Sequence, residues 1–245
     1  MYYGILEDGL VFRLHQQPGH MEPIPLSEAK VLPLVTPSKV VCVGLNYKAH
    51  AEELGYPLPN MPSFFLKPPS SIIGNGEPIV LPSGMGRIEH EAELAMVVGK
   101  VCRNLTPEEA EESLFGFTCA NDVTAREVQK VDPLIGHCKS YDTFCPIGPW
   151  IETELEDIND LSIRCLVNGE VRQSANTGDM IFRPLDLLCF LSRVMTLMPG
   201  DVILTGTPPG ISPIQADDVV QVSIEGIGTL SNPVEGPGPE EKILQ

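Results

Sequence analysis

Short apolar runs separated by turn residues recur along most of the chain, and they do not alternate regularly with helical patterns. Clear examples of these strand-like runs are Val40–Val43, Leu161–Val167 and Val219–Ile224. A doubly wound parallel sheet would place a helix after nearly every strand. The sequence therefore predicts a β-rich α+β fold.

Turn and capping residues locate several elements. Asp8-Gly9 and Asn168-Gly169 each lie between apolar runs, which predicts two β-hairpins. Thr106–Glu109 has the form of a capping box with proline at the first helical position, so we expect a helix that ends near Phe115. The longest helical pattern covers Pro184–Leu197.

The first part of the chain differs from the rest in composition. A proline-rich stretch follows the first hairpin and precedes the strand that begins at Val40. We expect residues 1–36 to form a small N-terminal domain and residues 37–245 to form the main domain, to which the candidate site residues below belong.

Charge restricts the partners of the protein. The 245 residues include 16 Lys and Arg but 33 Asp and Glu, a net charge of −17. Nucleic acids and anionic membranes bind clustered basic residues, so neither is an expected partner. An acidic enzyme with an anionic substrate needs a local positive centre, which a metal ion or a few placed cations can supply.

The location of the protein follows from its termini and its cysteines. The chain starts without the basic and then apolar segments of a signal peptide, and no run approaches the length of a membrane span. Its seven cysteines include no Cys-x-x-Cys pair. We expect reduced, mostly buried thiols in a cytoplasmic protein, and no zinc site made of cysteines.

The segment Ile88–Val98 carries three acidic residues within an apolar run. If it forms one strand, Glu89, Glu91 and Glu93 share a face, where their charges repel one another unless a cation lies between them. A solvated acidic edge is the alternative. No role is assigned to the neighbouring His90.

A second apolar segment ends in Asp122. This residue could cap a helix that begins at Val123, or it could bind a metal ion. Arg126 and Gln129 are three residues apart and would share a face of that helix. Three carboxylates, from Glu91, Glu93 and Asp122, suit Mg²⁺ or Mn²⁺ better than zinc.

A third segment pairs a histidine with an acid. His50 and Glu53 are three residues apart in a helix that Asn46 could cap and Gly55 could end. The carboxylate could orient the imidazole as a general base, although a surface His–Glu contact is the alternative.

Two further residues have weaker patterns. Lys139 lies in a loop-like stretch, where a solvated lysine is the plain interpretation. Thr207 lies in a Thr-Gly-Thr-Pro-Pro-Gly turn that lacks the Lys-Ser/Thr ending of a nucleotide-binding loop. The backbone N–H groups of this turn and the Thr207 hydroxyl could bind a carboxylate.

At these residues the chain resembles the fumarylacetoacetate hydrolase family, from about Val40 to Val234. The matching motifs occur in the family's order: Gly44-x-Asn46-Tyr47 with His50 and Glu53, Phe65-Leu66-Lys67-Pro68, His90-Glu91-x-Glu93, Asn121-Asp122-x-Thr124-Ala125-Arg126, Lys139-Ser140-x-Asp142, Val167-Asn168-Gly169, and Pro199-Gly200-Asp201 leading to Leu204-Thr205-Gly206-Thr207-Pro208. Leu45 departs from the pattern, because some members carry arginine there.

The resemblance implies a mixed β-sandwich roll after a small N-terminal domain, in a homodimer. It implies that Glu91, Glu93 and Asp122 bind the metal and that His50 and Glu53 form the base pair, on a segment that acts as a lid. It further implies the roles of four other residues: charge stabilisation by Lys139 and substrate contacts by Arg126, Gln129 and Thr207.

The reaction that we expect is cleavage of a C–C bond in an acylpyruvate-type β-diketo acid, which gives pyruvate and a carboxylic acid. His50 would activate water, and Lys139 would stabilise the enolate that leaves. The same enolate is reached by oxaloacetate decarboxylation, by oxaloacetate tautomerisation and by isomerisation of 2-hydroxyhepta-2,4-diene-1,7-dioate. These three reactions, and a non-catalytic metal-carboxylate binding protein, are the alternatives.

Overall fold

The computed structural model describes residues 3–14, 22–132 and 134–237. The chain divides into two compact units, Met1–Leu32 and Pro33–Gln245, and each is described by itself. The expected division into domains of residues 1–36 and 37–245 stays a prediction.

The first unit is a three-stranded antiparallel sheet in the order β1-β2-β3. Its strands are β1 (Gly4–Glu7), β2 (Leu10–Arg13) and β3 (Ile24–Pro25), and a 3₁₀ helix η1 (Leu26–Glu28) follows. The predicted hairpin at Asp8-Gly9 is confirmed, because Glu7 pairs with Leu10 and both turn residues have positive φ.

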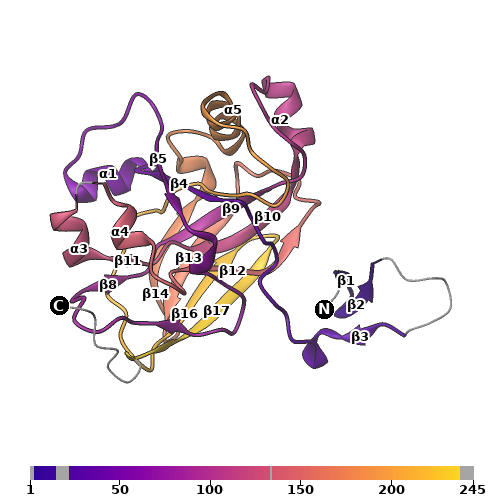
Figure 1. Ribbon diagram of the computed structural model, residues 1–245, viewed down its shortest axis with the longest axis horizontal. Coiled ribbons are helices and arrows are strands. Elements are labelled where there is room, and N and C mark those ends of the chain that lie inside the picture. Colours follow the sequence, from indigo (N-terminus) through magenta and orange to yellow (C-terminus); the bar gives the residue numbers. More distant parts are fainter. Residues whose placement is uncertain (1–2, 15–21, 133, 238–245) are drawn as a thin grey trace. The chain divides into compact units, whose positions relative to one another are not determined.

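A seven-stranded mixed sheet forms the centre of the second unit (Figure 1). In spatial order its strands are β5 (Ser63–Lys67), β4 (Val40–Gly44), β15 (Val202–Leu204), β9 (Ala92–Val98), β10 (Leu114–Asn121), β12 (Cys145–Glu152) and β6 (Ile72–Ile73). The pairs β4–β15 and β6–β12 are parallel and the others antiparallel.

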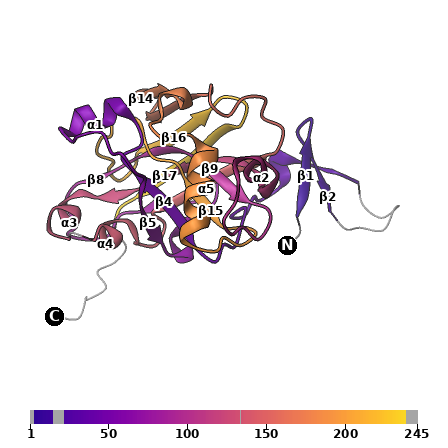
Figure 2. The ribbon, with the colours of Figure 1, turned by 90° about the horizontal axis from the view of Figure 1, so that it is seen from above.

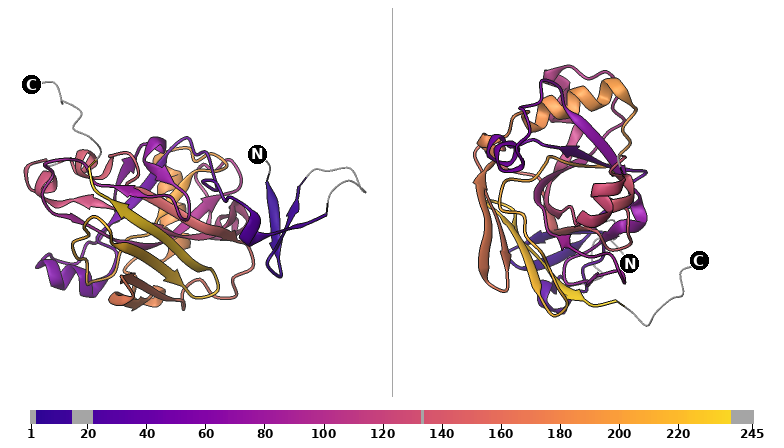
Figure 3. Two further views of the ribbon diagram at one scale, coloured as in Figure 1. Left: turned by 90° about the horizontal axis from the view of Figure 1, so that it is seen from below. Right: turned by 90° about the vertical axis from the view of Figure 1, so that its left-hand side faces the viewer.

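A second, five-stranded sheet lies along one side of this unit, and Figure 3 shows its four longer strands in orange and yellow. Its strands in order are β14 (Glu170–Asn176), β13 (Ser162–Val167), β16 (Val219–Ile224), β17 (Gly228–Glu235) and β7 (Ile79–Val80). The hairpin predicted at Asn168-Gly169 joins β13 to β14. A small sheet pairs β8 (Ile88–Glu89) with β11 (Thr124–Ala125).

The helices are short: α1 (Lys48–Leu54), α2 (Pro107–Ser113), α3 (Arg126–Val131), α4 (Gly136–Lys139) and α5 (Pro184–Val194), with 3₁₀ helices η2 (Pro69–Ser71) and η3 (Thr177–Asp179). Thr106 and Glu109 form the predicted capping box of α2. The helix predicted over Pro184–Leu197 ends three residues early, because Leu197 instead bridges to Cys102.

Three apolar clusters hold the second unit together. One lies between the two sheets and includes Leu94 and Ile163. Another joins the seven-stranded sheet to α2 and α5, which cross it in Figure 2, and includes Met96 and Leu191. A third, which includes Ala95, fills the opposite, inner face of that sheet. The expected β-rich α+β fold, a mixed β-sandwich roll, is confirmed.

The inner face of the roll leads to the site. Ala95 and Ala120 both lie in the inner cluster, and Ala120 pairs with Glu93 in the antiparallel ladder. Because side chains alternate along a strand, Glu93 shares the face of Ala95 and Asp122 shares the face of Ala120. The two acids therefore meet where the inner face ends.

None of the helices in the described part of the chain is long and apolar enough to cross a membrane.

Candidate active site

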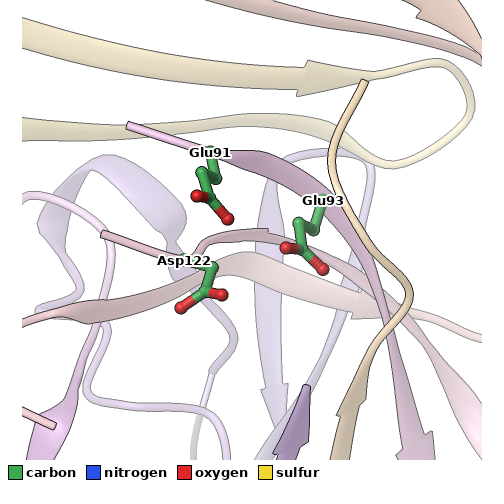
Figure 4. Close-up of side chains that lie close together, drawn as sticks. All are labelled: Glu91, Glu93 and Asp122. Carbon is green, nitrogen blue, oxygen red and sulfur yellow. The ribbon is translucent and has the colours of Figure 1, made fainter. Parts of the chain in front are cut away.

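Three buried carboxylates meet at the end of the inner face of the roll. Glu91, Glu93 and Asp122 each offer an oxygen, and these oxygens lie within 4.8 Å of one another. Figure 4 shows the three side chains turned toward a common space. The Asp122 N–H donates to the Glu91 carbonyl at 2.8 Å, which continues the pairing of β9 with β10 up to the site. Sequence reasoning selected the same three acids.

The strand expected over Ile88–Val98 is interrupted. His90 and Glu91 separate β8 from β9, and the two strands belong to different sheets. As a result Glu89 does not join the cluster, although it is 1% exposed. Its carboxylate pairs with Arg126 and with Arg87.

Two cations lie against the cluster. Lys139 Nζ donates to Glu91 Oε2 at 2.7 Å and to Asp122 Oδ2 at 2.6 Å, and Arg126 Nη2 pairs with Glu91. Burial opposes the ionisation of Glu91, but Lys139 and Arg126 outweigh it and hold the pKa of this carboxyl well below its usual value. Burial likewise disfavours the charged Lys139, yet Asp122 and Glu91 raise the pKa of its ammonium.

Glu93 has a different environment. It accepts a hydrogen bond from the Gly206 N–H at 2.5 Å. Burial, and then the charges of Asp122 and Glu91, raise the pKa of the Glu93 carboxyl well above its usual value. A divalent cation among the three acids would remove this penalty, and oxygen ligands of this kind fit Mg²⁺ or Mn²⁺.

Asp122 also pairs with Lys67, a residue that the sequence analysis includes only as part of a motif. Lys67 Nζ, whose side chain is fully buried, donates to Asp122 Oδ1 at 2.5 Å and to the Phe144 carbonyl at 2.7 Å. The alternative that Asp122 caps a helix from Val123 is wrong, because α3 begins at Arg126. Thr124 is part of β11 instead.

The histidine–glutamate pair forms as predicted. His50 Nδ1 lies 2.8 Å from Glu53 Oε2 on α1, which ends at Gly55 in the left-handed conformation. Glu53 Oε1 also accepts from the Gly210 N–H at 3.1 Å. The prediction that Asn46 caps this helix is wrong. The Asn46 side chain instead bonds the backbone of Phe182 and Thr205, which fixes the chain before α1.

One pocket of about 760 Å³ contains every residue that the sequence nominated. It lies at the end of the second unit where α1, α3 and α4 gather (Figure 1). These residues are Glu91, Glu93, Asp122, His50, Glu53, Lys139, Arg126, Gln129 and Thr207. Leu45, at φ 56°, and Arg87 also line it.

Within the pocket, some hydrogen-bonding groups are already engaged. Arg126 Nη1 donates to Gln129 Oε1 at 2.8 Å, as their shared helical face predicted. The Thr207 hydroxyl donates to the Ala92 carbonyl at 2.9 Å and accepts from Gln173 Nε2 at 2.8 Å. The sequence predicts that this hydroxyl could bind a substrate carboxylate, but in this structure it donates its proton to the Ala92 carbonyl instead.

The seven cysteines are all buried free thiols, as predicted. Within the described part of the chain, the group of side chains able to hold a metal ion consists of carboxylates alone.

Comparison with known proteins decides the family. The family model described as fumarylacetoacetate (FAA) hydrolase C-terminal matches residues 39–235. The chain belongs to this family. The similarity to relatives and solved structures of the fumarylacetoacetate hydrolase family covers far more of the chain than the short motifs do.

A 5-carboxymethyl-2-hydroxymuconate delta-isomerase from Mycobacterium smegmatis is 44% identical in sequence. Its structure superposes with a TM-score of 0.87 over 96% of this chain and 93% of that one. A mitochondrial oxaloacetate tautomerase of Homo sapiens is 42% identical over 86% of this chain and 71% of its own length.

A maleylpyruvate hydrolase from Sphingobium sp. SYK-6, solved with manganese(II) ion and pyruvate, is 36% identical. Its TM-score is 0.78, over 89% of this chain and 78% of that one. The relatives are thus enzymes of three kinds, an isomerase, a tautomerase and a hydrolase, within one fumarylacetoacetate hydrolase fold.

Proposed function

We propose that this protein is a divalent-metal-dependent hydrolase that cleaves a C–C bond in acylpyruvate-type β-diketo acids. The observation that carries the proposal is that one pocket holds both the His50–Glu53 pair and the cluster of Glu91, Glu93 and Asp122. A base alone, or a carboxylate cluster alone, would not support water addition to such a substrate.

Glu91, Glu93 and Asp122 would hold Mg²⁺ or Mn²⁺, because they offer three oxygens close together in a buried site. The bound ion would supply Lewis acidity toward the 2-oxo acid end of the substrate. The maleylpyruvate hydrolase relative was solved with manganese(II) and pyruvate, which supports this choice of ion.

The other residues would move protons and stabilise charge. His50, oriented by Glu53 at 2.8 Å, would take a proton from water, and the resulting hydroxide would attack the distal carbonyl. When the C–C bond breaks, its electron pair goes to the pyruvate part as an enolate, which a proton then converts to pyruvate. The distal part leaves as a carboxylic acid.

Lys139 would stabilise the enolate, and this role is supported by its ammonium, which lies at the Glu91 and Asp122 carboxylates on the pocket wall. Arg126 and Gln129 extend from α3 into the same pocket and would contact the substrate, and Thr207 would border it.

The test compares two substrates. His50→Ala should lower kcat/KM for acetylpyruvate hydrolysis by about 10²–10⁴-fold, the usual contribution of a positioned base. Oxaloacetate decarboxylation, which needs no activated water, should fall far less. Lys139→Ala should lower both, and His137→Ala, a histidine outside the pocket, should lower neither. Equal losses in the two reactions of His50→Ala would refute the assignment of His50 as the water-activating base.

A second candidate is proton transfer on a 2-oxo dicarboxylate, as in oxaloacetate tautomerisation or dienol-acid isomerisation. It is supported by relatives named for such reactions, which are 41–44% identical, while the hydrolase relatives are 36–41% identical. The ratio of oxaloacetate enol–keto conversion to acetylpyruvate hydrolysis in the wild-type enzyme distinguishes the two candidates.

A further inference from the structure

A buried glutamine from the other sheet contacts the backbone between two of the site's acids. Gln173 belongs to β14 of the five-stranded sheet and is 1% exposed. Its side-chain amide lies among the segment that contains His90 and Ala92 and the loop that contains Thr207. Neither the motifs nor the function proposed above gives it a role.

All four hydrogen-bonding positions of the Gln173 amide are used. Its Nε2 donates to Thr207 Oγ1 at 2.8 Å and to the Pro208 carbonyl at 2.7 Å. Its Oε1 accepts from the Ala92 N–H at 3.0 Å and lies 3.0 Å from His90 Nδ1. Since a backbone carbonyl can only accept, the orientation of the amide is fixed, and His90 must carry its proton on Nδ1.

These contacts close a ring around Ala92, the residue between Glu91 and Glu93. The Thr207 hydroxyl, which accepts from Gln173, donates to the Ala92 carbonyl at 2.9 Å. Both backbone polar groups of Ala92 are therefore held by two side chains that hold each other. The N–H belongs to the Glu91–Ala92 peptide unit and the C=O to the Ala92–Glu93 unit, so neither unit can rotate about Ala92 without breaking the ring.

Gln173 hydrogen-bonds the β9 backbone at Ala92, as a neighbouring strand does further along β9. Strand β15 pairs with β9 only from Ala95 to Val97, and the Thr205 N–H still reaches the Leu94 carbonyl at 3.0 Å. Beyond that point the chain turns away at Gly206, whose N–H bonds Glu93. The ladder position that β15 leaves open at Ala92 is occupied by Gln173 and Thr207.

The loop after β15 is shaped to permit this contact. Gly210 has φ +95°, and a Cβ on it would lie 2.2 Å from the Arg172 carbonyl of β14. Only glycine allows the loop to approach β14 so closely. The same loop carries the N–H groups of Gly206 and Gly210, which bond Glu93 and Glu53.

We infer that Gln173 is a positioning residue of the metal site, which sets the spacing of Glu91 and Glu93 by fixing the two peptide units that flank Ala92 between them. This inference rests on the proposed metal-dependent function. Loss of such a supporting contact typically weakens metal binding 10–100-fold.

The experiment measures Mn²⁺ affinity of the full chain by calorimetry, with unfolding in urea measured on the same samples. Wild type should bind Mn²⁺, and failure to do so would overturn the proposed function rather than the role of Gln173. Gln173→Leu should raise the Kd for Mn²⁺ by about 10–100-fold. Thr207→Val, which breaks the ring at its other member with little change of shape, should raise the Kd in the same direction and guards against a Gln173→Leu protein that does not fold.

Asn232→Leu is the matched control. Asn232 is also 1% exposed, and its amide donates to the Gly74 and Glu77 carbonyls; none of these three residues lines the pocket. This variant should lose stability but keep the wild-type Kd. An unchanged Kd in both Gln173→Leu and Thr207→Val, or an equal loss of affinity in Asn232→Leu, would overturn the inference.

Discussion

Two buried acids of the second unit, Asp201 and Glu93, show opposite ways of placing a carboxylate inside a protein. Asp201, just before β15, accepts from the backbone N–H groups of Ser38, Lys39 and Met198 and from the side chains of Ser38 and Lys39. Burial opposes its ionisation, but the bond from Lys39 and the other donors outweigh it, so the pKa of Asp201 is lowered.

Glu93, at the other end of the adjacent strand β9, accepts one hydrogen bond among the residues that the structure describes, from Gly206. Its other close charges include Asp122 and Glu91, and its pKa is raised by burial and by these two acids. The comparison teaches that a full set of donors suits a buried acid that maintains the fold, whereas few donors and acidic neighbours are the environment expected of an acid that would bind a cation.

The largest expected effect is on activity, which substitutions in the carboxylate cluster should abolish and a substitution at Asp201 should not. Glu91→Ala and Asp122→Ala should reduce metal-dependent turnover to background, because each removes a ligand oxygen. Asp201→Asn should keep turnover in its folded fraction. Calorimetric titration with Mn²⁺ checks the cause, and unchanged affinity in both site variants would show that these acids do not bind the metal.

The free energy of unfolding should show the reverse pattern, with a large loss at Asp201 and none at Glu93. Asp201→Ala should cost about 3 kcal/mol or more in the free energy of unfolding, because buried donors of Ser38, Lys39 and Met198 lose their acceptor. Glu93→Gln should leave the metal-free protein equally or more stable, since it removes a repelled acid. Urea unfolding with chelator present measures both, and a larger loss in Glu93→Gln than in Asp201→Ala would contradict the comparison.

Metal should stabilise the protein through the carboxylate cluster alone. At a free Mn²⁺ concentration about 100 times Kd, the free energy of unfolding should rise by about 2.7 kcal/mol. Chelator should remove this gain together with the activity. The gain should be absent in Asp122→Ala and present in Asp201→Asn, as thermal unfolding with and without Mn²⁺ would show.

The smallest effect is the dependence of stability on pH. Glu93 has a folded pKa above its unfolded value near 4.5, so its contribution is complete below that pH and is lost as pH rises toward the folded pKa. Asp201 has a folded pKa below 3.8, so its contribution is present above that pH and is lost as pH falls.

Each acid contributes at most about 1.4 kcal/mol per pH unit within its window. The difference in unfolding free energy between the metal-free wild type and Glu93→Gln should therefore fall as pH rises above 4.5. The difference between wild type and Asp201→Asn should fall as pH drops below 3.8. Flat differences in both windows would reject the assigned pKa directions.

Local sequence rules were sufficient where a residue's role depends on its chain neighbours. The hairpins at Asp8-Gly9 and Asn168-Gly169, the capping box before α2 and the His50–Glu53 pair all follow from short spacings. The ordered motifs of the resemblance then grouped Glu91 and Glu93, around the start of β9, with Asp122, just after β10, into one cluster. The residues of that cluster came together as expected.

What could not be predicted depends on contacts between distant segments. Nothing near Gln173 in the sequence indicates that it bonds residues 81 and 34 positions away. Lys67 lies 55 positions from Asp122. The break between β8 and β9 arises because β8 pairs with β11, a two-residue strand for which the sequence carries no clear pattern. The partner of Asn46, Phe182, is 136 positions away in the sequence. Local sequence rules could not show this contact and predicted a helix cap instead.

The buried thiols are distributed so that their reaction with a thiol reagent would report local opening of each packed layer of the protein. Each apolar cluster contains at least two cysteines: Cys119 and Cys165 between the sheets, Cys102 and Cys189 under the helices, and Cys42 and Cys145 inside the roll. A thiol reagent can react with them only when the surrounding layer separates from its neighbour, so labelling rates would rank the layers by how often each one opens. Occupation of the carboxylate cluster, whose Asp122 and Glu93 charges act on Cys42 and Cys145, would slow the reaction of this last pair most.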